Sequence, residues 1–243
     1  MKRILIDGLP RTGTTTLARL FAIHPQTRVI IEPFHPRRYE GRHHQAVISA
    51  ADTNQVFEFA WNQWNIIKHV WEAGVGWPFT RRPELQQRLW QSADLVIEVN
   101  RCNLAKRYLS AELSRTLRFW IGTRQDFVDR LRNVCLLPID IEKAKEAIQR
   151  DREALADRTA FLKRENICTA GFLFEEFFGA STDQQFDQIN TLFSTCGIPP
   201  LPQKYLRTHA SRWLNPEVYQ WSSEEVYQSI PNLAEFEAAF ASE

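Results

Sequence analysis

Residues 8–15, Gly-Leu-Pro-Arg-Thr-Gly-Thr-Thr, gather two glycines, one cation and three hydroxyls into eight positions. They follow a short apolar run at residues 4–6 and precede a segment with helical spacing. In this context main-chain N–H groups and a helix N-terminus converge on an anion. Gly8 and Gly13 have the separation of the phosphate-binding motif G-x-x-x-x-G-K-[ST], but Thr14 stands where that motif has lysine. The pattern predicts an anion-binding loop.

The missing lysine bears on which anion the loop binds. In triphosphate-binding proteins that lysine reaches the β- and γ-phosphates, so a kinase or ATPase without it would lack its main cation. Arg11 is the cation available within the loop, three residues before Thr14. We therefore expect a shorter anion, such as one phosphate joined to one sulfate. An atypical small-molecule kinase with this loop is the alternative.

Five segments of the chain resemble the sulfotransferase family. Residues 9–17 look like its 5′-phosphosulfate-binding loop, whose pattern is P-[KR]-[ST]-G-T-[TS], and residues 24–25, His-Pro, continue the resemblance. Residues 99–110, Val-Asn-Arg-Cys-Asn-Leu-Ala-Lys-Arg-Tyr-Leu-Ser, are similar to the family's 3′-phosphate motif, R-x-N-L-x-x-R-x-x-S. Residues 174–178 and 196–199 match the family's C-terminal pattern only loosely. Two specific motifs in the family's order carry the resemblance.

The resemblance implies transfer of a sulfuryl group from 3′-phosphoadenylyl sulfate (PAPS) to a hydroxyl of a carbohydrate, lipid or small metabolite, with no metal required. One departure is Thr16, since many family members have tryptophan there, packed on the adenine. The family's roles fall on Arg11, Thr12, Gly13, Thr14, Thr15 and Thr16 for the 5′-phosphosulfate, and on Arg101 and Ser110 for the 3′-phosphate. In the reaction itself, we expect Arg11 to stabilise the charge that develops on the departing phosphate.

A sulfuryl transfer also needs a base that removes the proton of the acceptor hydroxyl. Glu32 follows the apolar run at residues 29–31, and open α/β sheets bind their ligands at the carboxyl ends of the strands. We expect Glu32 to be the base, with His35 as the second candidate. If Glu32 proves dispensable while the nucleotide still binds, the alternative is a non-catalytic nucleotide-binding relative.

The elements around these residues follow a βαβ order. Apolar runs predict strands at residues 4–6, 29–31, 95–99 and 168–174. Helical spacing predicts helices at residues 14–23, 52–73, 83–90, 104–117 and 140–164, with another around 186–193 and one or two short helices after residue 201. We expect one domain over residues 1–243, a three-layer α/β fold of the phosphate-loop type with a mostly parallel sheet.

Composition limits the partners and the compartment. The formal net charge of +1 offers no global field for nucleic acid or an anionic membrane. Four cysteines without a C-x-x-C pair are typical of reduced thiols, and six histidines without paired spacing do not predict a metal site. The first apolar stretch is too short for a signal peptide and no later one reaches the length of a membrane span, so we expect a cytoplasmic protein.

Overall fold

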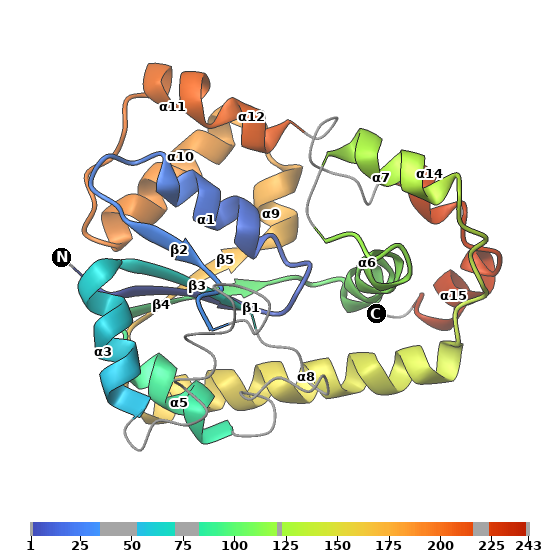
Figure 1. Cartoon of the computed structure of the whole chain (residues 1–243), viewed down its shortest axis with the longest axis horizontal. Helices are drawn as coiled ribbons and strands as arrows, with labels where there is room; N and C mark the ends of the chain where they lie inside the picture. Colours follow the sequence, from blue (N-terminus) through green and yellow to red (C-terminus); the bar gives the residue numbers. More distant parts are fainter. Residues whose placement is uncertain (1, 35–52, 71–82, 121–122, 216–223, 242–243) are drawn as a thin grey trace.

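The structure, a computed structural model, describes residues 2–34, 53–70, 83–120, 123–215 and 224–241. Within these ranges the chain forms a five-stranded sheet in the order β2-β3-β1-β4-β5, and each neighbouring pair is parallel (Figure 1). The strands are β1 (Ile4–Gly8), β2 (Val29–Ile31), β3 (Ile66–Val70), β4 (Leu95–Asn100) and β5 (Thr169–Leu173). The predicted α/β class with a mostly parallel sheet is confirmed.

Helices cover both faces of the sheet, as a parallel sheet requires. Above the sheet in Figure 1 lie α1 (Thr14–Ala22), α9 (Phe174–Gly179), α10 (Thr182–Thr195), α11 (Gln203–His209) and α12 (Ser211–Leu214). Below it lie α3 (Thr53–Gln63), α5 (Pro83–Gln91) and part of the 24-residue α8 (Ile141–Arg164). Successive side chains of a strand point to opposite faces. Ile4 and Ile6 therefore pack into the upper core, and Leu5 packs into the lower one.

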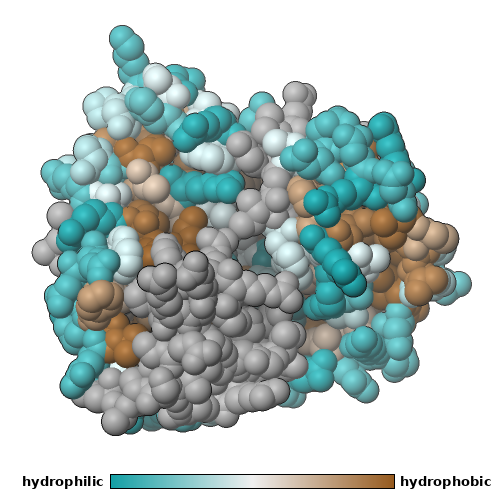
Figure 2. Space-filling model, in the orientation of Figure 1, coloured by the Kyte–Doolittle hydropathy of each residue, from teal (hydrophilic) through white to brown (hydrophobic). Residues whose placement is uncertain are grey.

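A third hydrophobic cluster lies beyond the carboxyl ends of the strands, on the right of Figure 1. It joins α6 (Leu104–Thr116), α7 (Arg124–Leu131), α14 (Glu224–Tyr227) and α15 (Leu233–Ala239) to the first half of α8. Hydrophobic side chains reach the surface on this side of the molecule (Figure 2). The cluster brings the C-terminal helices next to α6, which directly follows β4.

Strand register sorts the polar side chains of the sheet between its two faces. Ile6 pairs in register with Lys68, so Lys68 shares the upper face with Ile6. Asp7 pairs with His69 on one side and with Glu98 on the other, and these three share the lower face. The ends of the central strands therefore carry buried charged groups on both faces.

The prediction of one helix over residues 52–73 is wrong. Helix α3 ends at Gln63, and residues 66–70 form β3, the neighbour of β1. The polar pair Lys68 and His69 hid the strand, because a buried parallel strand usually reads as an apolar run. Both are buried with partners: Lys68 pairs with Glu32, and His69 lies 2.9 Å from the Gln86 amide oxygen. Residues 52 and 71–73 lie outside the described residues.

The predicted number of helices after residue 201 is also wrong. After residue 201 the described ranges contain four short helices, α11, α12, α14 and α15, where we expected one or two. Helix α7 was not predicted either. Its start follows a capping box, in which Thr123 accepts from the Asp126 N–H and the Asp126 carboxylate accepts from the Thr123 N–H. The other predicted helices lie within four residues of their observed ends.

Candidate functional site

The loop between β1 and α1 turns sharply at its glycines. Gly13 has a φ of 89° and Arg11 a φ of 70°, so the chain takes a left-handed conformation twice within three residues. A Cβ on Gly8 would lie 2.7 Å from the carbonyl oxygen of Val99, and one on Gly13 would lie 2.9 Å from Phe178. Glycine at both positions lets the loop pass close to β4 and α9. Such turns direct main-chain N–H groups into one concavity, at the positive end of a helix.

The threonines of the loop have different environments. Thr12 is buried and donates its hydroxyl hydrogen to the carbonyl of Leu9 over 2.7 Å, so it ties the loop together. Thr14 is buried in the first turn of α1, whereas Thr15 and Thr16 remain partly exposed. Within the described residues no side chain caps the N-terminus of α1, and its first turn contains no acidic residue. The N-terminal N–H groups of α1 are not neutralised from within the helix.

The second motif meets the loop at its cation. Ser110, on α6, accepts a hydrogen bond from Arg11 Nε over 2.9 Å, across 99 residues of sequence. Arg101, which follows β4, donates from Nη1 to the carbonyl of Arg11 over 3.1 Å. Strands β1 and β4 are neighbours. The chain continues from β1 to β2 at one edge of the sheet and from β4 to β5 at the opposite edge, and open α/β sheets bind ligands at such a point. The structure therefore brings together Arg11, Arg101 and Ser110.

The guanidiniums of Arg11 and Arg101 are near enough to repel each other. Burial lowers the pKa of Arg11 from 12.5 to about 10, with a smaller lowering from Arg101. Burial also lowers the pKa of Arg101, and Glu175 opposes this with its Oε1 3.7 Å from Arg101 Nε. Among the described residues, Nε of Arg101 has no hydrogen-bond partner. A bound anion would relieve the repulsion and supply acceptors to both side chains.

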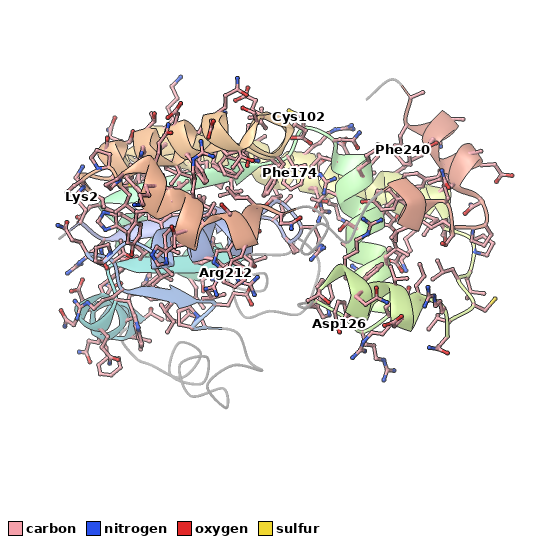
Figure 3. All side chains as sticks on the ribbon, turned by 90° about the horizontal axis from the view of Figure 1, so that it is seen from above. Lys2, Cys102, Asp126, Phe174, Arg212 and Phe240 are labelled. Atoms are coloured by element: carbon pink, nitrogen blue, oxygen red, sulfur yellow. The ribbon has the colours of Figure 1, made fainter. Side chains whose placement is uncertain are left out.

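Helix α9 supports the site from the side of β5. The Arg101 guanidinium lies 4.5 Å from the centre of the Phe174 ring. The Glu175 carboxylate accepts from the main-chain N–H groups of Cys102 and Asn103, at 2.9 and 3.1 Å. Cys102 and Phe174 both lie where the sheet meets α6 (Figure 3). The segment 174–178, which resembled the family only loosely, is thus part of the site.

Residues 24–25 and 196–199, which also resemble the sulfotransferase family, contact each other and have a structural role. His24 Nε2 lies 2.9 Å from the carbonyl oxygen of Pro199, and His24 Nδ1 accepts from the Gln26 N–H over 3.1 Å. The acceptor role of Nδ1 places the proton on Nε2, which then donates to Pro199. These segments attach the end of α1 to the chain after α10, away from the loop.

Glu32 lies at the carboxyl end of β2, where we expected it, with a left-handed φ of 52°. Its N–H donates to the Lys68 carbonyl over 2.7 Å, and its carboxylate forms an ion pair with the buried Lys68 ammonium. Strand β3 separates β2 from β1, so two strand spacings, roughly 10 Å, lie between the end of β2 and the end of β1. His35 lies outside the described residues.

Several site residues had no assigned role in the sequence analysis. Arg107 donates from Nη1 to the Pro10 carbonyl over 3.3 Å and pairs with the buried Asp151. It belongs to the R-x-N-L-x-x-R-x-x-S pattern, which was the signal that could have found it. Lys68 had no such signal, because its partner Glu32 is distant in sequence.

No metal cluster and no membrane span is present in the described part of the chain. No three His, Cys, Asp or Glu residues are arranged there to hold a metal ion. Of the helices described, none is both long and apolar enough to cross a bilayer. A comparison with protein-family models found no match, and a search of curated proteins found no significant relative.

Proposed function

We propose that this protein is a sulfotransferase that uses PAPS as its sulfuryl donor. The observation that carries the proposal is the 2.9 Å hydrogen bond between Arg11 and Ser110. The two motifs that resemble the donor-binding motifs of sulfotransferases are separate in sequence but contact each other in space. A donor with phosphates at both the 3′ and the 5′ position needs two such anion sites side by side.

The proposed reaction forms a bond between the acceptor oxygen and sulfur and breaks the bond between sulfur and the bridging oxygen of the 5′-phosphosulfate. The bonding electrons leave with adenosine 3′,5′-bisphosphate. In this proposal Arg11 and the N–H groups at the start of α1 stabilise the charge that grows on the 5′-phosphate.

Glu32 is the proposed base for the acceptor proton. Lys68 pairs with it, and an adjacent ammonium favours the ionised carboxylate, the form that can take up a proton. The attacking oxygen must lie within hydrogen-bonding distance of the Glu32 carboxylate and next to the sulfur. The Glu32 side chain and the phosphosulfate must therefore reach toward each other across the two strand spacings between β2 and β1.

A transfer assay tests the proposal. PAPS labelled on sulfur is incubated with the protein and separate panels of carbohydrate, lipid and small hydroxyl-bearing acceptors. Arg11→Ala should lower the transfer rate by about 10²–10³-fold, the scale for losing one preorganised charge-stabilising donor. Arg132→Ala is the matched control, because it removes an exposed cation between α7 and α8. The transfer rate of this variant should be unchanged. Wild-type transfer by Arg11→Ala would show that the loop does not act on the donor.

A further inference from the structure

Tyr227, at the end of the short helix α14, contacts the segment 99–110, which carries the second motif. The Tyr227 side chain is 2% exposed and packs in the cluster that joins α6, α14 and α15. Its hydroxyl donates to the carbonyl of Lys106 over 3.3 Å. Lys106 lies in the first turn of α6, five residues after Arg101 and one turn before Ser110. The phenol oxygen is therefore at the start of the helix that carries the second motif.

Tyr227 also affects both guanidiniums of the site. Tyr227 interacts electrostatically with Arg11 and with Arg101, and it opposes the lowering of the pKa that burial causes in each. Hydrogen bonding to Tyr227 adds to the raising of the Arg101 pKa. An oxygen from the C-terminal segment thus interacts with the two cations that we assign to the donor.

We infer that Tyr227 is a third residue of the 3′-phosphate site and that its hydroxyl donates a hydrogen bond to a phosphate oxygen. This inference rests on the proposed function. A phosphate presents only acceptors, so it needs donors on several sides. Arg101 approaches from the end of β4, Ser110 from the second turn of α6, and Tyr227 from the C-terminal cluster. The long bond to Lys106 is the one that the hydroxyl exchanges for the phosphate.

The test compares Tyr227→Phe with the wild type by isothermal titration calorimetry, using adenosine 3′,5′-bisphosphate and AMP, which lacks the 3′-phosphate. Phenylalanine keeps the ring in its cluster and removes only the hydroxyl. We expect the affinity for the bisphosphate to fall about tenfold, since a hydrogen bond to a charged group is lost. The affinity for AMP should stay within about twofold. Tyr108→Phe is the matched control, because Tyr108 is buried in the same cluster but faces Glu112 and Arg115.

The outcomes separate this inference from the proposed function. If the wild type binds the bisphosphate in preference to AMP and Tyr227→Phe binds it equally well, the inference is wrong while the proposed function stands. A gain in affinity would show that the phenol competes with the phosphate, which also overturns the inference. If the wild type shows no preference for the bisphosphate, the proposed function itself fails. Retained secondary structure by circular dichroism establishes that both variants are folded.

Discussion

Arg101 donates a hydrogen bond from Nη1 to the main-chain carbonyl of Arg11 over 3.1 Å, so the end of β4 holds the loop that follows β1. Arg11 has a φ of 70°, which a non-glycine residue keeps only when its surroundings impose it. Ser110 constrains the same residue through its side chain. The two proposed anion sites are therefore mechanically joined, and the loss of Arg101 is expected to weaken the binding of AMP as well as of the bisphosphate. For this reason Tyr227→Phe should separate the two phosphates more cleanly than a variant of Arg101.

Gly13→Ala should damage the loop through both backbone and packing. The new Cβ would lie 2.9 Å from Phe178 and 3.1 Å from Phe174, at a φ of 89° that alanine rarely adopts. We expect the free energy of unfolding to fall by about 1–3 kcal/mol and the affinity for the bisphosphate to fall with it. Urea unfolding and calorimetry measure the two effects. Gly171→Ala is the control, because a Cβ there meets nothing within 4 Å, and it should leave both quantities unchanged.

The pair of Glu32 and Lys68 allows catalysis to be separated from stability. Glu32→Gln should leave donor affinity nearly unchanged and lower turnover by about 10²–10⁴-fold, the range for general-base catalysis. It should also lower the free energy of unfolding by about 1–3 kcal/mol, because a carboxylate that pairs with a buried ammonium is lost.

The double variant Glu32→Gln/Lys68→Met removes both charges of the pair. It should recover stability relative to Glu32→Gln but recover no turnover. Recovery of turnover in the double variant would mean that Glu32 acts on the fold and not on the acceptor proton.

Arg158 should be one of the most sensitive positions for stability. Its fully buried guanidinium, on α8, lies 3.4 Å from Asp7, 2.6 Å from the Asn100 side-chain oxygen and 3.3 Å from Glu98. Arg158→Met would remove the guanidinium that pairs with the buried Asp7 carboxylate. Breaking such a pair costs about 3–5 kcal/mol, which urea unfolding would detect.

A control variant and a double variant test the prediction for Arg158. Lys163→Met on the exposed face of the same helix should change the free energy of unfolding by less than about 0.5 kcal/mol. Adding Asp7→Asn to Arg158→Met should restore part of the loss. If Arg158→Met is as stable as Lys163→Met, the contacts of Arg158 with Asp7, Asn100 and Glu98 do not stabilise the fold.

The four cysteines should differ in reactivity. Burial raises the pKa of Cys196 to about 12, so its thiol stays protonated at pH 8, whereas Cys102, Cys135 and Cys168 are exposed. Alkylation of the native protein at pH 8 should modify the three exposed thiols, and Cys196 should react only after denaturation.

Cys102 also reports on the site, because it directly follows Arg101 in the sequence. Adenosine 3′,5′-bisphosphate should slow the alkylation of Cys102 and leave that of Cys135 unchanged, as peptide mass spectrometry can measure. Equal rates at Cys102 with and without the nucleotide would contradict a phosphate site at Arg101.

The parts of the fold that the sequence predicts well are those with strong local patterns. Residues 4–6 are a continuous apolar run and residues 95–99 are apolar except for Glu98, and they form the two strands beside the loop. Strand β3 was missed because its Lys68 and His69 are buried only through partners on other elements. Hydrophobic periodicity carries no information about such pairing.

The same reasoning applies to the site. Arg11, Arg101 and Ser110 were predicted from two motifs, and the structure brings them into contact. Tyr227 could not be predicted, because only the packing of the C-terminal helices against α6 places it there. Thr12 was predicted as a ligand, and its hydroxyl bonds to Leu9 within the loop.

The most direct test of the central claim is a thermal-shift panel of adenosine 3′,5′-bisphosphate, AMP, ADP and ATP with Mg²⁺. A ligand at about 100 times its dissociation constant adds about 2.7 kcal/mol of stability, enough to rank the nucleotides clearly. Our account predicts the largest rise in melting temperature with adenosine 3′,5′-bisphosphate, since it alone fills both the loop at Arg11 and the second site at Arg101. A larger rise with ATP and Mg²⁺ would contradict it and would favour the kinase alternative.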